Sequence, residues 1–504
     1  TAINMIDLAG IAVYARDRGE NDPIILGGGP CAYNAEPVAD FFDIFYIGEG
    51  ETRYQDLIDL YRECREQNLG RVEFLRRAAR LPGLYVPMFY EVSYNEDGTI
   101  KSFLPTEKGI PVSIRKEIVM DLSNTNYPMK PVVPYIKVTQ DRVVLEIQRG
   151  CIRGCRFCQA GQLYRPVRER DVDTLKKYAL EMLANTGHEE VSLSSLSSSD
   201  YTKLPELIDF LIEECNKKKI NISLPSLRID AFSLDVMSRV QDIRKSSLTF
   251  APEAGSQRMR DVINKNVCEE DLLRAVNVAF EAGKNMVKLY FMQGLPTETY
   301  EDIEGIAILA SHVIDAYYKC PTRNKAKKPQ VTISVACFIP KPFTPFQWEA
   351  QDSLEMLAEK QEFLGSKITD RKIKFNHHDA KVSRIEAVLA RGDRRLSDAL
   401  ELACREGFKF DAWDEYFDYD KWISVLERTG ADPAFYANRA FGLDEVLPWD
   451  IIDCGVTKEF LRRERDKAYA ENTTPNCREK CSGCGANRLG GERTCCPKLS
   501  KTEN

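Results

Sequence analysis

Short apolar runs alternate with longer amphipathic segments from residue 143 onward. Buried strands of a parallel sheet read as short, nearly continuous apolar runs, so these runs predict strands. The predicted strands are residues 143–147, 190–193, 220–224, 247–251, 286–292 and 331–338. Segments with apolar residues at helical spacing lie between and after them and predict helices at 172–183, 204–215, 234–240, 272–282, 300–318 and 355–364.

This regular alternation predicts parallel strands joined by right-handed helical crossovers. Six strand–helix units over residues 143–380 are fewer than the eight of a complete barrel. We therefore predict an α/β fold with a partial, TIM-like (β/α)6 barrel as its core.

The chain before the barrel predicts part of a second α/β domain, over residues 1–115. Apolar runs at 23–26 and 41–47 predict strands, which end in the glycine turns GGGP (27–30) and GEGE (48–51), and a helix follows. Two such units are fewer than a doubly wound sheet contains, so we expect a truncated Rossmann-like domain. A proline-rich linker is predicted at 116–142, a helical region at 381–470 and a cysteine-rich tail at 471–504.

Composition narrows the class of protein. Of 504 residues, 43% are hydrophobic and 29% charged, and the net charge is −7, which excludes a disordered chain and a general polycation. We expect neither a membrane-spanning helix nor a signal peptide. The 16 cysteines include two tight clusters rather than the even framework of a small secreted domain. We therefore expect metal sites and a reducing, cytoplasmic location.

The first cysteine cluster is the triplet Cys151, Cys155 and Cys158, spaced C-x3-C-x2-C directly after a predicted strand. Three thiolates leave one iron of a four-iron cluster open for a small molecule. The alternative is a structural zinc site, which usually needs a fourth Cys or His nearby.

With Phe157, this triplet resembles the signature of the radical S-adenosylmethionine (SAM) superfamily, C-x3-C-x-aromatic-C. The resemblance implies a [4Fe–4S] cluster on Cys151, Cys155 and Cys158 that binds SAM through its open iron. It also implies reductive cleavage of SAM to methionine and a 5′-deoxyadenosyl radical, with electrons from a donor such as flavodoxin or ferredoxin.

The family places further SAM contacts after later strands. After the second strand, Ser195 and Ser197 stand where the family often has Gly-Gly-Glu, and a plain serine-rich turn is the alternative. After the fourth strand, Glu253, Ser256 and Arg258 match polar positions that contact SAM, and a helix N-cap is the alternative. After the fifth strand, Gly294 resembles a turn near the adenine, or an ordinary loop.

The flanking regions resemble an uncharacterised bacterial family of radical SAM proteins, whose N-terminal domain is of the cobalamin-binding type. Residues 24–51 carry this likeness, together with the segments APEAGSQRMR and IEAVLARGDRR. It implies bound cobalamin, although the chain's four histidines lie elsewhere, at His188, His312, His377 and His378. The alternative is a degenerate domain kept for its fold.

The second cysteine cluster lies in the tail. It comprises Cys477, Cys481, Cys484, Cys495 and Cys496. These thiols predict a zinc site or an auxiliary iron–sulfur cluster, separate from the barrel, and free cysteines are the alternative. Residues 458–504 carry 11 basic and 7 acidic side chains, a weak indication of an anionic partner.

Two functions remain open at this point. The first is an enzyme that modifies a macromolecule, either RNA or a ribosome-associated protein, by methylation or sulfur insertion. The second is a catalytically idle iron–sulfur module that binds or senses.

Overall fold

The computed structural model describes residues 1–224, 229 and 248–490. The predicted helix at 234–240, the first residue of the predicted strand at 247–251, and Cys495 and Cys496 lie outside these residues. The chain divides into two compact units, each assembled from three segments. The first unit comprises 1–119, 338–356 and 379–462, and the second comprises 120–337, 357–378 and 463–504. The domains predicted from the sequence are continuous ranges instead, and their bounds remain predictions.

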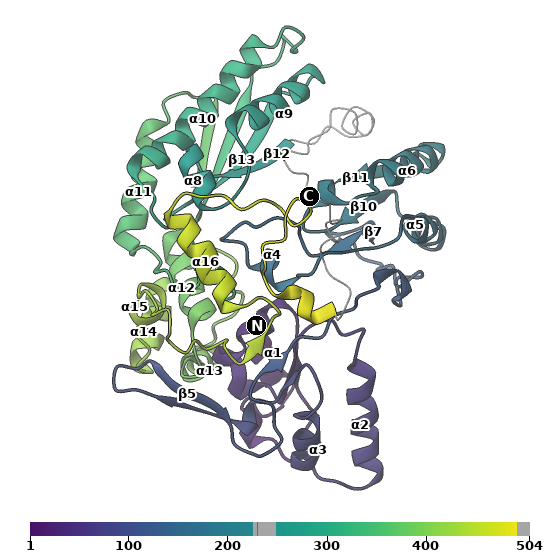
Figure 1. Ribbon diagram of the computed structural model, residues 1–504, viewed down its shortest axis with the longest axis vertical. Coiled ribbons are helices and arrows are strands. Elements are labelled where there is room, and N and C mark those ends of the chain that lie inside the picture. The colour runs from purple at the N-terminus through teal and green to yellow at the C-terminus, as the bar shows by residue number, and fades with distance from the viewer. Residues whose placement is uncertain (225–228, 230–247, 491–504) are drawn as a thin grey trace, which may run out of the picture. The chain divides into compact units, whose positions relative to one another are not determined.

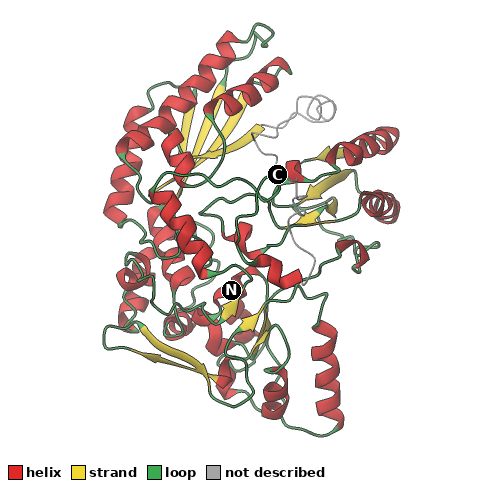
Figure 2. Cartoon of the chain, viewed as in Figure 1, coloured by secondary structure: helices red, strands yellow, loops and turns green. Residues whose placement is uncertain are grey.

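The second unit contains two parallel sheets (Figure 2). The first has the order β11-β10-β7, and the second has the order β12-β13-β14-β15. Their strands are β7 (Val143–Glu146), β10 (Glu190–Ser194), β11 (Asn221–Ser223), β12 (Leu248–Glu253), β13 (Met286–Gln293), β14 (Gln330–Cys337) and β15 (Ile373–His377). A short antiparallel pair, β8 (Gln148–Arg149) and β9 (Arg168–Glu169), lies beside the cysteine triplet. The described strands form parallel sheets without closing a barrel.

Helices follow the strands, and those at 172–186, 204–218, 269–281, 300–319 and 354–367 lie where the sequence pattern predicts them. They are α4 (Gln159–Leu163), α5 (Val172–Thr186), α6 (Leu204–Lys218), α8 (Gln257–Val262), α9 (Glu269–Glu281), α10 (Tyr300–Lys319), α11 (Leu354–Lys367) and α16 (Lys458–Tyr469). In the second sheet, α9 packs against β12 and α10 against β13 and β14, and their apolar faces share one core. Figure 1 shows both helices beside β12 and β13. Local signals set their ends: Asp171 caps α5, and Gly187 ends it in the left-handed conformation.

The seventh parallel strand, β15, was not predicted. It pairs with β14 from Val331–Ile373 to Val335–His377. Of its five residues Ile373 alone is buried, because the strand lies at the sheet edge. Its sequence, IKFNH, therefore lacks the apolar run that marked the other strands.

The first unit is built around a small mixed sheet, a helical bundle and a hairpin. Its strands are β1 (Leu26–Gly27), β2 (Ile44–Tyr46), β3 (Leu84–Tyr85), β4 (Tyr90–Tyr94), β5 (Ile100–Pro105), β6 (Ile114–Arg115) and β16 (Ile452–Asp453). Its helices are α1 (Ala2–Leu8), α2 (Tyr54–Glu66), α3 (Arg71–Ala78), α12 (Ala380–Arg391), α13 (Leu396–Arg405), α14 (Tyr419–Arg428) and α15 (Pro433–Ala437). The last four helices share a core that includes Val388, Leu396 and Trp422.

The first predicted strand, at 23–26, is shorter and later than expected. Regular pairing begins at Leu26, and β1 is only partly buried. The Ile25 amide just before it is bound by the Asp43 side chain at 2.7 Å instead of by a neighbouring strand. Gly27 lets β2 approach closely, because an added Cβ there would lie 2.7 Å from the Phe45 ring. None of the helices in the described part of the chain combines the length and the apolar character needed to cross a bilayer.

Candidate functional site

The cysteine triplet lies in the loop between β8 and α4, residues 150–158, which we call the cluster loop. Gly150 starts this loop with φ +83°, and an added Cβ there would lie 2.6 Å from the Tyr164 carbonyl oxygen. A side chain at this position would therefore displace the loop. Cys158 is the N-cap of α4, and Phe157 before it is half-buried.

Backbone amides donate hydrogen bonds to two of the three thiols. The Arg153 amide donates to the Cys151 sulfur at 3.4 Å, and the Gly161 amide donates to the Cys158 sulfur at 3.3 Å. Burial raises the pKa of Cys151 to about 12 and that of Cys158 to about 11. Such thiols stay protonated at neutral pH until a metal displaces the proton. Amide donors to sulfur also tune the potential of a bound cluster.

The donor set consists of three thiolates from one loop, and thiolates are the ligands that hold iron–sulfur clusters. A four-iron cluster binds each thiolate through a different iron, so its ligands stand apart around it. Cys151, Cys155 and Cys158 lie near enough to affect one another's ionisation. They would hold the cluster and leave one iron open.

A buried arginine inside the triplet ties the loop to distant parts of the second unit. Arg156 has no exposed side-chain surface. Its guanidinium donates to the Val262 carbonyl at 2.9 Å, to the Asn472 carbonyl at 2.7 Å and to the Glu464 carboxylate at 3.2 Å. The loop is therefore held by α16 and by the segment after it.

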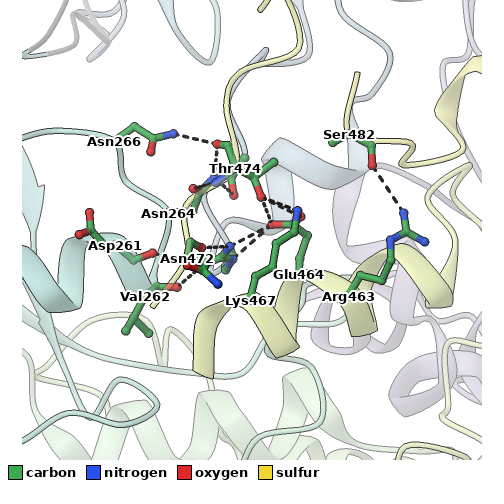
Figure 3. A network of polar contacts seen from close by, with 12 residues as sticks. Asp261, Val262, Asn264, Asn266, Arg463, Glu464, Lys467, Asn472, Thr474 and Ser482 are labelled. Carbon is green, nitrogen blue, oxygen red and sulfur yellow. Dashed lines mark hydrogen bonds and ion pairs between the residues drawn. The ribbon is translucent and has the colours of Figure 1, made fainter. Parts of the chain in front are cut away.

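Asn264 makes a second connection of the same kind (Figure 3). Its amide nitrogen donates to the Gly154 carbonyl at 3.0 Å and to the Thr474 carbonyl at 3.2 Å, and its oxygen accepts from the Thr474 amide at 2.7 Å. The Thr474 hydroxyl donates to the Glu464 carboxylate at 2.9 Å. Glu464, Asn264 and Thr474 thus form one polar network under the cluster loop.

The serine-rich turn after β10 also reaches the cluster loop. Arg153 forms a two-pronged ion pair with Asp200, at 2.6 and 3.0 Å. The Ser197 hydroxyl donates to the same carboxylate at 2.7 Å, and Ser195 exchanges a hydrogen bond with Ser198 at 3.0 Å. These contacts tie the turn to the loop that carries the thiols. A SAM contact through Ser195 or Ser197 remains a prediction.

Glu253 ends β12 in an unusual backbone conformation. Its φ is +70°, at a break in the register between β12 and β13. Its carboxylate pairs with Lys265 at 3.1 Å, and both charges act on Cys158. A non-glycine residue with positive φ costs free energy and occurs often at functional sites. The structure therefore brings Glu253 into the neighbourhood of the triplet.

Ser256 and Arg258 converge on Asp302. Ser256 is the N-cap of α8, and its hydroxyl donates to Asp302 at 2.5 Å. Arg258 forms an ion pair with Asp302 and donates to the Thr297 carbonyl at 2.8 Å. These contacts support the capping alternative for Ser256 and give Arg258 a structural role. Their contacts to SAM remain predictions.

Gly294 follows β13 with φ +79°, a conformation that suits glycine. Its amide donates to the Glu298 carboxylate at 2.7 Å, and Glu298 pairs with Lys360 at 2.9 Å. This arrangement fixes the turn. Its place near an adenine remains a prediction.

The C-terminal cysteines do not lie apart from the barrel. The Cys477 amide donates to the Ile152 carbonyl, next to Cys151, at 3.0 Å. Cys477, Cys484 and Cys151 line one cavity of about 370 Å³. Cys484 is buried and Cys481 is exposed. Backbone contacts that no local pattern reveals dock the tail on the cluster loop, and metal binding by the tail independently of the first triplet stays a prediction.

Sequence reasoning missed three residues of this site: Arg156, Arg165 and Asn264. Arg156 and Arg165 are charged, and such residues are mostly exposed, so nothing in the pattern indicated their burial. The one usable signal was position, since Arg156 stands between two cysteines of the triplet. Asn264 has φ +53°, which asparagine tolerates better than most residues, but the sequence alone does not reveal this.

Comparison with known proteins identifies the core. The family profile "Radical SAM proteins, N-terminal" matches residues 1–87, and "Radical SAM superfamily" matches residues 145–310. The second match contains the cysteine triplet, the serine-rich turn, Glu253 and Gly294.

Relatives extend the likeness along most of the chain. An uncharacterised protein of Methanocaldococcus jannaschii is 31% identical over 418 residues, which are 82% of each chain. A putative methylthiotransferase of the same organism is 24% identical and covers 42% of this chain and 50% of its own. The threonylcarbamoyladenosine tRNA methylthiotransferase of Aquifex aeolicus is 25% identical and covers 38% of this chain and 49% of its own. The chain thus spans about half the length of these two relatives.

Solved structures that align with the chain include that of the cobalamin-dependent SAM radical enzyme OxsB. Its TM-score is 0.41 and its identity 12%, and the alignment covers 93% of this chain and 67% of the OxsB chain. The radical SAM methyltransferase TsrM of Kitasatospora setae has a TM-score of 0.39 and 14% identity over 62% of this chain and 55% of its own. With the profile matches and the cysteine triplet together, the chain belongs to the radical SAM superfamily and is a radical SAM enzyme, for which the family implies a [4Fe–4S] cluster and SAM.

Proposed function

We propose that this enzyme cleaves SAM at a [4Fe–4S] cluster on Cys151, Cys155 and Cys158 and uses the product radical to modify RNA. The observation that carries the proposal is the triplet itself, in one loop after the first parallel strand, with amides donating to two of its sulfurs. When bound, the cluster and SAM supply a one-electron cleavage that yields methionine and a 5′-deoxyadenosyl radical.

The chain's own residues would position SAM. Glu253 stands at the end of β12, near enough for its charge to act on Cys158, and its carboxylate could accept hydrogen bonds from the SAM ammonium group. Ser195 and Ser197 lie on the turn that Asp200 ties to the cluster loop. Open parallel sheets bind ligands beyond the carboxyl ends of their strands, and each of these residues lies at or just after such an end, which supports their role. Arg258 and Gly294 complete the proposed set.

The substrate is proposed from two relatives and from charge. One relative is named as a putative methylthiotransferase, and the other as a tRNA methylthiotransferase. Residues 458–504, which begin with α16, carry an excess of basic side chains. Together they favour RNA over protein as the partner, with methylation and sulfur insertion as the two candidate modifications.

The test is an assay of anaerobically reconstituted, reduced protein. We expect 5′-deoxyadenosine from SAM, with more of it when bulk RNA is present and a mass shift in digested nucleosides. The matched control is Cys404→Ser, which alters a half-buried cysteine of α13, outside residues 24–51, and should change neither readout. An intact cluster without any 5′-deoxyadenosine would instead support the idle iron–sulfur module. Stimulation by ribosomal protein but not by RNA would transfer the proposal to a protein substrate.

Two further cofactors are proposed from resemblance. Cobalamin is placed in the first unit, where residues 1–119 contain no histidine to ligate its cobalt. Titration with hydroxocobalamin should shift its visible spectrum, and an unchanged spectrum would remove cobalamin from the proposal. The C-terminal cysteines are proposed to bind either zinc or a second cluster.

A further inference from the structure

The cavity beside the cluster loop is lined by both cysteine groups of the second unit. Its volume is about 370 Å³, and its wall includes Cys151, Arg165, Glu169, Thr202, Cys477 and Cys484. A water molecule occupies roughly 30 Å³ of liquid, so the cavity is much larger than one bare metal ion needs. Cysteines more than 300 positions apart in sequence, Cys151 on one side and Cys477 and Cys484 on the other, thus line the same cavity.

The C-terminal side of this cavity is held in place. Arg478 pairs with Glu169 at 2.6 Å, and Arg463 donates to the Gly483 carbonyl at 3.1 Å. Cys484 is 7% exposed, and Ala486 is fully buried. These contacts give the loop from Cys477 to Cys484 a defined position, as a preorganised ligand loop requires.

A buried positive charge faces the C-terminal thiols. Arg165 is 3% exposed and lies within hydrogen-bonding reach of Cys484. It also donates to the Gly161 carbonyl at 3.0 Å and to the Arg153 carbonyl at 3.2 Å, which fix its orientation. Burying a cation is costly unless negative charge lies near it. Cluster-bound thiolates would supply that charge and accept the hydrogen bond.

We propose that Cys477, Cys481 and Cys484 bind a second iron–sulfur cluster in this cavity, facing Arg165. The inference deepens the proposed function by choosing between the two metals left open for these cysteines. The spacing C-x3-C-x2-C repeats that of the first triplet, and the cavity is larger than a single zinc ion needs. Cys481, an exposed cysteine between the other two in sequence, is the third thiol of the proposed set.

Iron analysis of the full-length chain, reconstituted with ferrous iron and sulfide, tests the proposal. Wild type should bind about eight iron atoms, as two four-iron clusters would. The triple variant Cys477→Ser/Cys481→Ser/Cys484→Ser should bind about four, and Cys404→Ser should match wild type. Wild type with about four irons and one zinc, or with about four irons and no other metal, would overturn the inference.

A second variant guards against misfolding of the first. The variant Cys151→Ser/Cys155→Ser/Cys158→Ser cannot cleave SAM but should retain about four irons, with a cluster signal by Mössbauer spectroscopy. Adding Arg165→Met should then make the reduction potential of that cluster more negative, because a nearby positive charge favours the reduced form, whereas Arg165→Lys should change it less. An iron-free triple variant, or a potential indifferent to Arg165, would contradict the proposal. SAM cleavage by wild type is scored separately, so either proposal can fail alone.

Discussion

Arg156 and Glu464 form a buried ion pair across 308 positions of sequence. Both guanidinium contacts to the carboxylate are 3.2–3.3 Å long, and the side chains are 0% and 4% exposed. Arg156 belongs to the cluster loop and Glu464 to α16. The pair therefore links the cysteine triplet mechanically to the C-terminal part of the second unit.

Breaking this pair should cost stability. Glu464→Leu leaves the Arg156 charge buried without its carboxylate, so we expect a loss of about 3 kcal/mol in the free energy of unfolding. Asp59→Asn, at the exposed Arg62–Asp59 pair, is the matched control and should cost less than about 1 kcal/mol. Denaturant unfolding measures both. Equal effects would show that the buried pair contributes no more than a surface pair.

The same pair predicts a dependence on pH. Although burial opposes ionisation, the hydrogen bond from Lys467 and the charge of Arg156 hold the pKa of Glu464 below its ordinary value. A depressed carboxylate pKa adds stability above the unfolded value, about 4.3, which is lost as pH falls through the folded value. In metal-free protein, Glu464→Gln should therefore weaken the fall of Tm below pH 5. An unaltered pH profile would contradict this assignment.

Removing residues 471–504 should weaken binding of the cluster proposed on Cys151, Cys155 and Cys158, as well as removing the metal site proposed in the tail. The deletion takes away Thr474 and the Asn472 carbonyl, which bind Asn264 and Arg156 beneath the loop. We expect faster loss of barrel iron to a chelator and a lower rate of SAM cleavage. A truncated chain with wild-type cleavage would show that the loop keeps its geometry without the tail.

Cys151→Ala should abolish the barrel cluster and SAM cleavage while the protein stays folded. Three thiolates are the whole protein ligand set proposed for that cluster, so losing one leaves two irons open. Visible absorbance, iron content and 5′-deoxyadenosine should fall together, whereas the far-ultraviolet circular dichroism should not change. Cys215→Ala, at a buried cysteine of α6, controls for losing a thiol alone.

Local patterns predicted most of the elements that carry the site but few of the contacts between them. The predicted strand at 286–292 and helix at 300–318 differ from β13 and α10 by one residue, because buried apolar periodicity marks both. The edge strand β15 left no such pattern. Contacts such as Arg156–Glu464 and Cys477–Ile152 join residues about 300 positions apart, and a single sequence does not encode that pairing locally. For the same reason the tail was expected to stand alone.

The last prediction separates the functional and structural roles of Glu253 and Arg258. Glu253 adopts φ +70°, so Glu253→Gly relieves backbone strain of about 1 kcal/mol or more, while Glu253→Gln keeps the strain and removes the charge. If the carboxylate contacts SAM, both variants should weaken SAM binding by roughly tenfold, which is about 1.4 kcal/mol.

Melting temperature should then distinguish the two, because Glu253→Gly should be the more stable variant. Arg258→Ala breaks the ion pair with Asp302 and must lower Tm whatever its role in binding. Asp302→Asn loses the same ion pair but keeps the Arg258 guanidinium. If the Kd for SAM is higher in Arg258→Ala than in Asp302→Asn, the guanidinium itself contacts SAM. Equal Kd values in these two variants would show that Arg258 only connects α8 to α10. Wild-type SAM affinity in both Glu253 variants would show that the Glu253 carboxylate does not bind SAM.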